Sequence, residues 1–415
     1  MDGCGTARVE VEQSSDPVLV PRDGCPWAET AVLNPAIVRD DGSGLLHMLF
    51  RATGPFDGKW PAGNVAPYPI FLGYASSSDD GRTWDPDFSR PALAPALESR
   101  IDRMTVTDSQ GRRVTNFANG CIEDPRITII DGTAYLSAAG RMFPPGPYWI
   151  HDDPMQCAPD WARHGDHPFG REAAENVTVS GLFELDLDRL AARDYDAAFR
   201  YIGPLTDAEL GDNRDAFLFP EQLNIRGRNK FVALHRPWKG SGYPGGRPGM
   251  KPSIWMACAD RMEDLATGRA THRILAEPVL DWEGDRIGAS WPPIRLSSSE
   301  WLLPYHGKMD TVTGYTQSFL ILDAGRDGWP EIKHRCSDRL MYARHPWERD
   351  ESKFKTPCVF TTAGCLVNGT LVMSYGAADL KVGIGRVRFE ELVRHVRTFD
   401  ASGHEIAGRM TRWQR

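Results

Sequence analysis

The 415-residue sequence lacks the features that mark nucleic-acid-binding and membrane-spanning proteins. Its formal net charge of -8 provides no basic field that would attract nucleic acid. No run reaches the roughly 18 consecutive apolar residues of a membrane-spanning helix. The first residues, Met-Asp-Gly-Cys-Gly, lack a basic start and an apolar core. We therefore expect no signal peptide, no membrane partner and a cytoplasmic location.

The cysteines are few and scattered. The chain has eight of them, with no Cys-x-x-Cys pair and no spacing typical of a zinc site. Such usage predicts reduced, mostly buried thiols in a reducing compartment, without disulfides. We expect neither a metal nor a cofactor.

Glycine, proline and tryptophan are plentiful, with 40, 31 and 13 residues, as expected for an all-β protein of many hairpins. One pattern recurs: a proline, a short apolar run, a turn and a second apolar run that ends in small or polar residues. In its clearest copy, Ile-Glu-Asp-Pro-Arg at residues 122–126 opens a β-branched run that ends at the Asp131-Gly132 turn. The other copies start at Pro35, Pro220, Pro293 and Pro357. Five hairpins at intervals of roughly 60 to 95 residues predict radially repeated sheets, a β-propeller.

Other segments have simpler interpretations. Residues 77–84, Ser-Ser-Asp-Asp-Gly-Arg-Thr-Trp, match the Asp-box, a structural turn in which Asp79 caps a hairpin. Residues 1–30 are expected to form an irregular arm or a strand that closes the ring. Residues 386–415 are expected to form a closing segment with a short amphipathic stretch. No linker separates parts of the chain, so we predict a single domain over 1–415.

A propeller would gather several polar side chains on one face. Some candidates lie near the starts of first strands, and others lie at or just beyond the ends of second strands, where the antiparallel chain returns to the same face. Carboxylates, arginines and a histidine in one central-axis pocket suit a ligand rich in hydroxyls, and paired carboxylates cleave glycosides. The alternative is a salt-bridged strand entrance without chemistry. The residues so placed are Asn34, Asp124, Arg126, Glu221, Arg51, Arg236, His306 and Asp379.

At these residues the sequence resembles glycoside hydrolase family 130, the β-mannoside phosphorylases and mannosidases. The matching pieces follow the family's order between about residues 31 and 385. They are Asn34-Pro35-Ala36, Phe50-Arg51-Ala52, Ile122-Glu123-Asp124-Pro125-Arg126, Leu218-Phe219-Pro220-Glu221, Leu234-His235-Arg236-Pro237, Tyr305-His306-Gly307 and Tyr375-Gly376-Ala377-Ala378-Asp379.

The resemblance implies a five-bladed propeller and an inverting enzyme acting on β-linked mannosides. It implies that Asp124 is the general acid, acting through a hydroxyl of the bound sugar, and that Asn34, Arg51 and Asp379 hold the mannose. The substrate is then a small oligosaccharide, and a homo-oligomer is an open alternative to a monomer. The full set of candidate substrate-binding residues is Asn34, Arg51, Glu123, Arg126, Asp215, His235, Arg236, Tyr305, His306, Asp310 and Asp379.

One departure from the family decides between two nucleophiles. Family phosphorylases carry a phosphate-binding arginine on the strand where this chain has Thr178. Phosphate needs charge-assisted donors, so the loss favours water and hydrolysis. Hydrolysis needs a base roughly 6.5–9.5 Å from the acid, for which Glu221 is the first candidate and Asp310 the second. Phosphorolysis, with inorganic phosphate as co-substrate, stays open because other cations could bind the anion: Arg126, Arg214, Arg236, His235, His306 and Lys308.

Two other classes of protein remain as alternatives. A non-catalytic sugar-binding propeller would have no use for the retained Asp124. A retaining sialidase would need several Asp-boxes and an arginine triad with a tyrosine nucleophile, which the sequence does not offer.

Residues 144–174 read as a long loop insertion, and long ordered loops are often functional. The loop's three histidines, His151, His164 and His167, match no metal-ligand spacing. Its aromatic residues show neither helical nor alternating spacing, so we expect them to wall the aglycone side of the sugar pocket. The alternative is a packed surface loop that does not contact the ligand. These aromatic residues are Tyr148, Trp149, Trp161 and Phe169.

Overall fold

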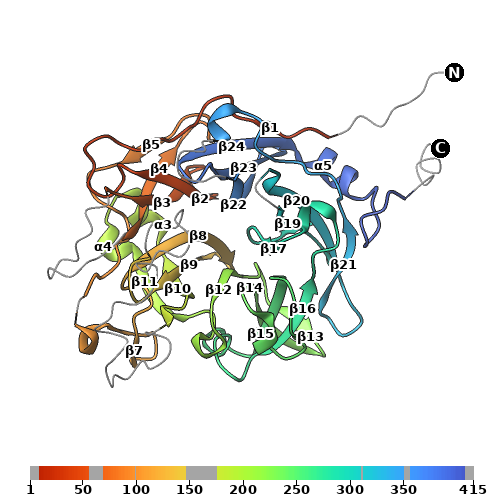
Figure 1. Ribbon diagram of the computed structural model, residues 1–415, viewed down its shortest axis with the longest axis horizontal. Helices are drawn as coiled ribbons and strands as arrows, with labels where there is room; N and C mark the ends of the chain where they lie inside the picture. The colour runs from red at the N-terminus through yellow and green to blue at the C-terminus, as the bar shows by residue number, and fades with distance from the viewer. Residues whose placement is uncertain are drawn as a thin grey trace.

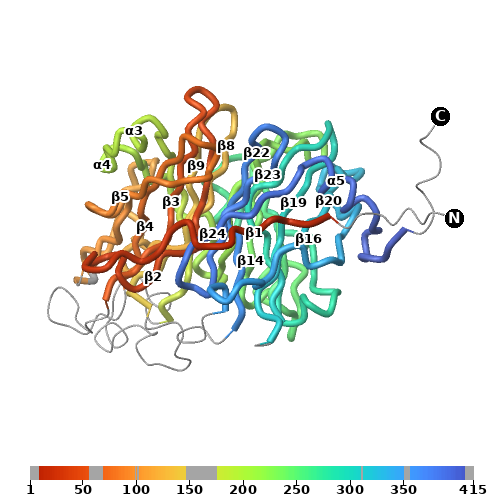
Figure 2. Tube along the Cα trace, turned by 90° about the horizontal axis from the view of Figure 1, so that it is seen from above, coloured from red at the N-terminus to blue at the C-terminus, as the bar shows by residue number. Residues whose placement is uncertain are grey.

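The computed structural model describes residues 9–55, 69–98, 100–145, 175–309, 312–349 and 356–406. Its strands form five antiparallel blades arranged as a ring, with the innermost strands β2, β8, β12, β17 and β22 around the centre (Figure 1). Figure 2 shows the same ring edge on. The fold is an all-β, five-bladed β-propeller.

Each blade runs outward from its innermost strand. Blade 1 contains β2 (Ala31–Arg39), β3 (Leu46–Thr53), β4 (Ile70–Ser77) and β5 (Asp85–Asp87). Blade 2 contains β8 (Cys121–Ile130), β9 (Thr133–Arg141), β10 (Val179–Leu185) and β11 (Phe199–Pro204). Blade 3 contains β12 (Asn213–Leu218), β14 (Arg228–Pro237), β15 (Ile254–Ala259) and β16 (Thr271–Ala276), and β13 (Leu223–Ile225) also pairs with β14. Blade 4 contains β17 (Arg286–Ala289), β18 (Ile294–Arg295), β19 (Glu300–Met309), β20 (Gly314–Ala324) and β21 (Pro330–Arg335). Blade 5 contains β22 (Val359–Val367), β23 (Thr370–Ala377), β24 (Lys381–Arg388) and β1 (Glu12–Gln13).

Short elements connect the blades. The strands β6 (Thr105–Thr107) and β7 (Arg113–Thr115) form a small hairpin between blades 1 and 2. The α-helices of the described ranges are α3 (Leu187–Ala191), α4 (Tyr195–Ala198) and α5 (Phe389–Val396). The 3-10 turns in the same part of the chain are η1 (Ile101–Arg103), η3 (Ala208–Leu210), η4 (Gly240–Gly242), η5 (Met262–Asp264), η6 (Asp281–Glu283) and η7 (Pro346–Glu348). No helix in the described ranges is long and apolar enough to cross a membrane.

The blades pack on one another through their apolar faces. In blade 1 the Trp27 and Phe50 rings stack with centroids 6.2 Å apart. Between blades 3 and 4 the Phe219 and Trp301 rings meet edge to face at 5.3 Å. The ring is closed by β1, which pairs with β24, so the N-terminal arm completes the blade built by the last strands of the chain. The expectation of a closing strand within residues 1–30 is confirmed.

The hairpin predictions are confirmed at Pro35, at residues 122–137 and at Pro357. At Pro220 and Pro293 the hairpins exist, but the blades begin earlier, with β12 and β17. The Asp-box is also confirmed as a turn. The Asp79 carboxylate accepts bonds from the Arg82 and Thr83 amides at 3.0 and 2.9 Å and from the Thr83 hydroxyl at 2.7 Å.

Candidate active site

The site is built by a β-bulge that repeats at the same place in three innermost strands. In β2, β8 and β12 one residue in the bulge has a positive φ: 44° at Asn34, 53° at Asp124 and 50° at Asp215. Asn and Asp enter this left-handed region more readily than other side chains. A bulge also re-aims the side chain that it carries. These three residues are therefore structural equivalents.

The Asp124 carboxylate lies among groups from blades 1 and 2. Its Oδ1 accepts a hydrogen bond from Asn34 Nδ2 at 2.8 Å and another from Arg51 at 3.1 Å. The same Arg51 nitrogen lies 2.9 Å from Glu123 Oε2. The Asp124 side chain keeps 13% of its surface exposed, so a ligand can reach a carboxylate that is otherwise enclosed.

Arg126 is turned toward the next blade, because the bulge between Glu123 and Arg126 breaks the regular alternation of the strand. One guanidinium nitrogen lies 2.8 Å from Asp215 Oδ1. A second donates to the main-chain carbonyl of Asp124 at 3.1 Å, and Nε donates to the carbonyl of Ser290 at 2.8 Å. Arg126 therefore joins blades 2, 3 and 4 and forms no ion pair with the Asp124 carboxylate.

Asp215 is a structural carboxylate that holds three basic groups at the axis. Besides Arg126, it meets Arg236 Nε and lies 3.3 Å from His306 Nε2. Burial would raise the pKa of Asp215, but Arg236, His306 and Arg126 hold it well below its usual range. Burial lowers the pKa of His306 although Asp215 acts to raise it.

Asp124 and Asp379 have pKa values shifted in opposite directions. Burial would raise the pKa of Asp124, but Arg51, Arg126 and the Asn34 hydrogen bond lower it. Asp379 lies in the turn after β23, where its φ is 55°. Burial raises its pKa to about 6, Arg51 opposes this shift, and the Asp124 charge adds to it. The Cys358 thiol lies 3.7 Å from Asp379 Oδ1. At pH 6 Asp379 is therefore about half protonated, whereas Asp124 is ionised.

A guanidinium group stands beside Thr178, where the strand itself offers none. Arg214, from the next blade, donates to Thr178 Oγ1 at 3.4 Å and approaches Glu123 Oε1 at 3.8 Å. One third of its side chain is exposed. Burial and the Arg214 charge lower the pKa of the nearby Arg141, whose Nε has no hydrogen-bond partner within the described ranges. Two cations thus lie beside the acidic group of Glu123 and Asp124.

The placement of Glu221 beside Asp124 is wrong. Glu221 follows the far end of β12, where it accepts from Arg295 at 2.7 Å and from Trp301 Nε1 at 2.8 Å. Trp301 precedes His306 by five residues on β19, which is about 17 Å along a strand. Glu221 is therefore at the opposite end of the blade from Asp215, because the innermost strand begins before Pro220 and not after it.

Several other residues that were predicted to belong to the site lie away from Glu123 and Asp124. Tyr305 is buried and donates to Glu283 Oε1 at 2.8 Å, on the side of β19 away from His306. His235 contacts Asn213 at 2.9 Å and His272 at 3.3 Å. Lys308 pairs with Asp285 at 3.0 Å. Asp310 and all but the first two residues of the 144–174 loop lie outside the described residues, with Tyr148, Trp149, Trp161 and Phe169 among them.

An exposed aromatic residue beside the site escaped the sequence prediction. Trp238, two residues after Arg236, is 44% exposed. The Arg286 guanidinium lies 5.2 Å from the Trp238 ring and 5.2 Å from the Tyr315 ring. These cation–π contacts hold the tryptophan in place. The sequence signal was available, because Trp238 directly follows the Leu-His-Arg-Pro piece of the family resemblance.

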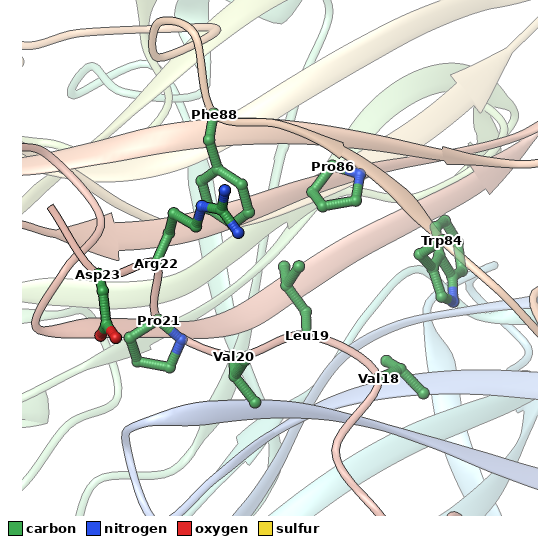
Figure 3. Close-up of a pocket in the computed structure, with 9 residues that line it drawn as sticks. All are labelled: Val18, Leu19, Val20, Pro21, Arg22, Asp23, Trp84, Pro86 and Phe88. Atoms are coloured by element: carbon green, nitrogen blue, oxygen red, sulfur yellow. The ribbon is translucent and has the colours of Figure 1, made fainter. Parts of the chain in front are cut away.

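A separate cleft of about 520 Å³ lies beside the outermost strand of blade 1 (Figure 3). Residues 18–23 form one wall, and Trp84, Pro86 and Phe88, at β5, form the other. The bulges of Asn34, Asp124 and Asp215 are on innermost strands, so this cleft is not part of their site.

Known proteins agree with the architecture and the motifs. A family described as beta-1,4-mannooligosaccharide phosphorylase, glycoside hydrolase family 130, matches residues 188–398, about half of the chain. A 1,2-beta-oligomannan phosphorylase from Thermoanaerobacter sp. (strain X514) is 24% identical over 92% of this chain and 99% of its own. A beta-1,2-mannobiose phosphorylase from the same organism is 23% identical over 91% of this chain and 97% of its own.

Among solved structures, the beta-1,2-mannobiose phosphorylase of Listeria innocua is similar, with a TM-score of 0.61 and 17% identity over 93% of this chain and 99% of its own. This likeness supports the propeller fold. The chain belongs to glycoside hydrolase family 130 and is an enzyme, a glycoside hydrolase or a glycoside phosphorylase.

Proposed function

We propose that this enzyme is a β-mannoside phosphorylase. It uses inorganic phosphate to cleave the terminal mannosyl unit of a β-linked manno-oligosaccharide, with inversion, and releases α-mannose 1-phosphate. This replaces the expectation of hydrolysis. The observation that carries the proposal is the Arg214 guanidinium 3.4 Å from Thr178 Oγ1.

Arg214 removes the reason for preferring water. The preference rested on the missing arginine in the Thr178 strand, and Arg214 brings an arginine to the same place from the neighbouring blade. Phosphate takes bidentate, charge-assisted bonds from guanidinium groups. Arg141, whose Nε has no partner among the residues that the structure describes, adds a second positive charge nearby.

The position of Glu221 also favours phosphate. A water nucleophile needs a base to take its proton, and Glu221 is bound to Arg295 and Trp301 at the other end of its blade. Phosphate already carries negative charge and needs no such base. The two relatives that match more than nine-tenths of this chain are phosphorylases.

In the proposed reaction a phosphate oxygen forms a bond to C1 of the mannosyl unit while the bond from C1 to the glycosidic oxygen breaks. The departing oxygen needs a proton, which Asp124 supplies through a hydroxyl of the bound sugar. Asn34, Arg51 and Asp379 hold the mannosyl unit. The positions suit this division, because Arg51 contacts both Asp124 and Glu123 and therefore lies beside the proposed acid.

Trp238 supplies a surface for the part of the oligosaccharide that leaves. A pyranose ring has an apolar C–H face, and an exposed indole held by Arg286 offers a flat partner without a large loss of side-chain freedom. The departing sugars thus extend from Asp124 toward Trp238.

The direct test is to incubate the purified protein with β-1,2- and β-1,4-linked manno-oligosaccharides, with and without phosphate, and to follow the products by NMR. We expect α-mannose 1-phosphate and a requirement for phosphate. Equal release of free mannose with and without phosphate would contradict the proposal.

A matched pair of variants locates the phosphate site. Charge-assisted hydrogen bonds are worth about 1.5–3 kcal/mol, so Arg214→Ala should raise the KM for phosphate about 10- to 100-fold and change the KM for the oligosaccharide little. Arg295→Ala removes a guanidinium from the far end of the blade and should leave both constants unchanged. An unchanged phosphate KM in Arg214→Ala would remove Arg214 from the site.

A further inference from the structure

Three side chains of types that can bind a metal ion meet between blade 4 and the C-terminal helix, away from the innermost strands. Cys336 and Asp338 follow β21, and His395 is in the last turn of α5. Their sulfur, carboxylate oxygen and imidazole nitrogen atoms lie within 4.8 Å of one another. His395 Nε2 and Asp338 Oδ2 are 3.0 Å apart. We propose that this cluster binds Zn²⁺ and fastens the C-terminal helix to the propeller.

The donor set selects the ion. A thiolate and an imidazole disfavour the oxygen-seeking Mg²⁺ and Ca²⁺ and suit Zn²⁺. With bonds of about 2.0–2.3 Å, a tetrahedral Zn²⁺ separates its ligand atoms by roughly 3.3–3.8 Å. The three side chains therefore need shifts of less than about 1 Å to bind the ion. The fourth position is left for water.

The backbone of the ligand loop is held in place before any metal arrives. The Ser318 hydroxyl lies 3.0 Å from the carbonyl of Cys336 and 2.8 Å from that of Asp338. Trp282 Nε1 donates to the carbonyl between them, that of Ser337, at 2.9 Å. Partners of this kind orient ligands and limit the entropy lost on binding.

The third ligand is fixed by the helix. The ring of His395 packs against Phe399 with centroids 5.5 Å apart, and its carbonyl accepts from Thr398 Oγ1 at 2.7 Å. Figure 2 shows α5 beside β20 at the rim of the ring. The His395 and Asp338 side chains keep 15% and 21% of their surface exposed, which gives the ion a path from solvent.

A bound ion would join two segments that are far apart in the sequence. The cluster connects the segment after β21 to α5, so the ion would cross-link the outer edge of blade 4 and the last helix. On binding, Cys336 gives its proton to solvent and becomes the thiolate ligand. Stability should change with the metal, and the kinetics at Asp124 should not.

The test uses the full-length protein freed of metal by a chelator and titrated with Co²⁺ as a spectroscopic probe, then with Zn²⁺. We expect one equivalent of Co²⁺ to give a thiolate-to-cobalt charge-transfer band, Zn²⁺ to abolish that band, and Zn²⁺ to raise the Tm. Cys336→Ser should remove the band. His395→Gln, which keeps the thiol, should weaken binding by at least about tenfold.

Cys365→Ser is the matched control, because it removes another thiol, on β22 of blade 5, and should leave the titration unchanged. Circular dichroism checks that each variant is folded. The proposal is overturned by the absence of the band in the wild type. It is also overturned by a band that persists in Cys336→Ser, or by an equal Zn²⁺-dependent rise in the Tm of wild type and His395→Gln.

Discussion

At the scale of single residues, the site depends on side chains that tolerate a left-handed backbone. Asn34, Asp124 and Asp215 occupy one bulge position in three blades, and each has a different function. Asn34 donates to Asp124, Asp124 keeps 13% of its side-chain surface exposed, and Asp215 holds Arg126, Arg236 and His306. The surrounding charges decide which carboxylate remains available for chemistry.

Asp124→Asn should abolish turnover and preserve the fold. Asparagine accepts the φ of 53° at this position, and its amide oxygen can still accept from Asn34 and Arg51. The lost proton donor should lower kcat by about 10²–10⁴-fold. Activity assays check the loss of turnover, and thermal unfolding checks that the fold is preserved. Near-wild-type activity would exclude Asp124 as the acid.

The raised pKa of Asp379 predicts the pH dependence. Because burial raises this pKa to about 6, Asp379 is mostly protonated below that pH and mostly ionised above it. Ionisation leaves the Asp379 carboxylate able only to accept hydrogen bonds, so its proposed contact with the mannosyl unit should weaken and kcat/KM should fall as pH rises through about 6. Asp379→Asn removes this titration and should remove the corresponding fall in kcat/KM, whereas the titration of phosphate itself is common to both proteins. An unchanged fall in kcat/KM at the same pH in the variant would assign it to another group.

The raised pKa of Asp379 also predicts how the stability of the fold changes with pH. A carboxyl group whose pKa is higher in the folded than in the unfolded state favours folding at low pH. For Asp379 this contribution is complete below the ordinary value of 3.8 and is lost as pH rises through about 6. Urea unfolding at pH 4 and pH 7 should therefore show a smaller pH-dependent loss in Asp379→Asn than in the wild type.

At the scale of elements, the hairpins were predictable and the bulges were not. Alternating apolar runs and Asp-Gly turns identify hairpins locally. The innermost strand of blade 3 was misplaced because Asp215 is followed by Ala216, whereas Asn34 and Asp124 are followed by proline. A search for blade starts that relies on proline misses Asp215 and finds Pro220 instead. Glu221, which follows Pro220, was therefore predicted to lie in the site.

The pairing of Arg214 with Thr178 illustrates a second limit. The two residues are 36 positions apart and belong to different blades. Only the packing of one blade on the next brings them together. Comparison of the Thr178 strand with the same strand of the family phosphorylases therefore shows a missing arginine. The folded protein nevertheless has an arginine at this place, because Arg214 reaches it from the next blade.

Glycine at the blade interface allows the polar cluster to pack. A Cβ on Gly288, in β17, would lie 2.6 Å from His306 Nε2 and closer still to Asp215. Gly288→Ala should therefore destabilise the protein by about 1–3 kcal/mol and reduce activity. Gly203→Ala, in β11, is the control, because its Cβ would meet no atom of the described residues within 4 Å. Equal unfolding midpoints for the two variants would contradict the tight packing around Asp215.

At the scale of the molecule, the first and last segments are joined where the ring closes. Gln13 of β1 donates to Glu348 Oε1 at 2.8 Å and to the carbonyl of Tyr342 at 3.1 Å. Tyr375, in β23 of the same blade, donates to the same Glu348 oxygen at 2.7 Å. Glu348 is fully buried, and its other oxygen accepts from the amides of Arg344 and His345. One carboxylate therefore joins the N-terminal arm, blade 5 and the segment before it.

Closure should consequently depend on Gln13 more than on its neighbour. Gln13→Ala leaves a buried carboxylate oxygen and a carbonyl without one donor each, which costs about 1–3 kcal/mol per unsatisfied group. Glu12 is exposed on the same two-residue strand, so Glu12→Ala keeps the backbone pairing with β24 and loses little. Urea unfolding should show a lower midpoint for Gln13→Ala alone. If the two variants unfold together, pairing of β1 with β24 closes the ring by its main chain, and the buried contact with Glu348 adds nothing.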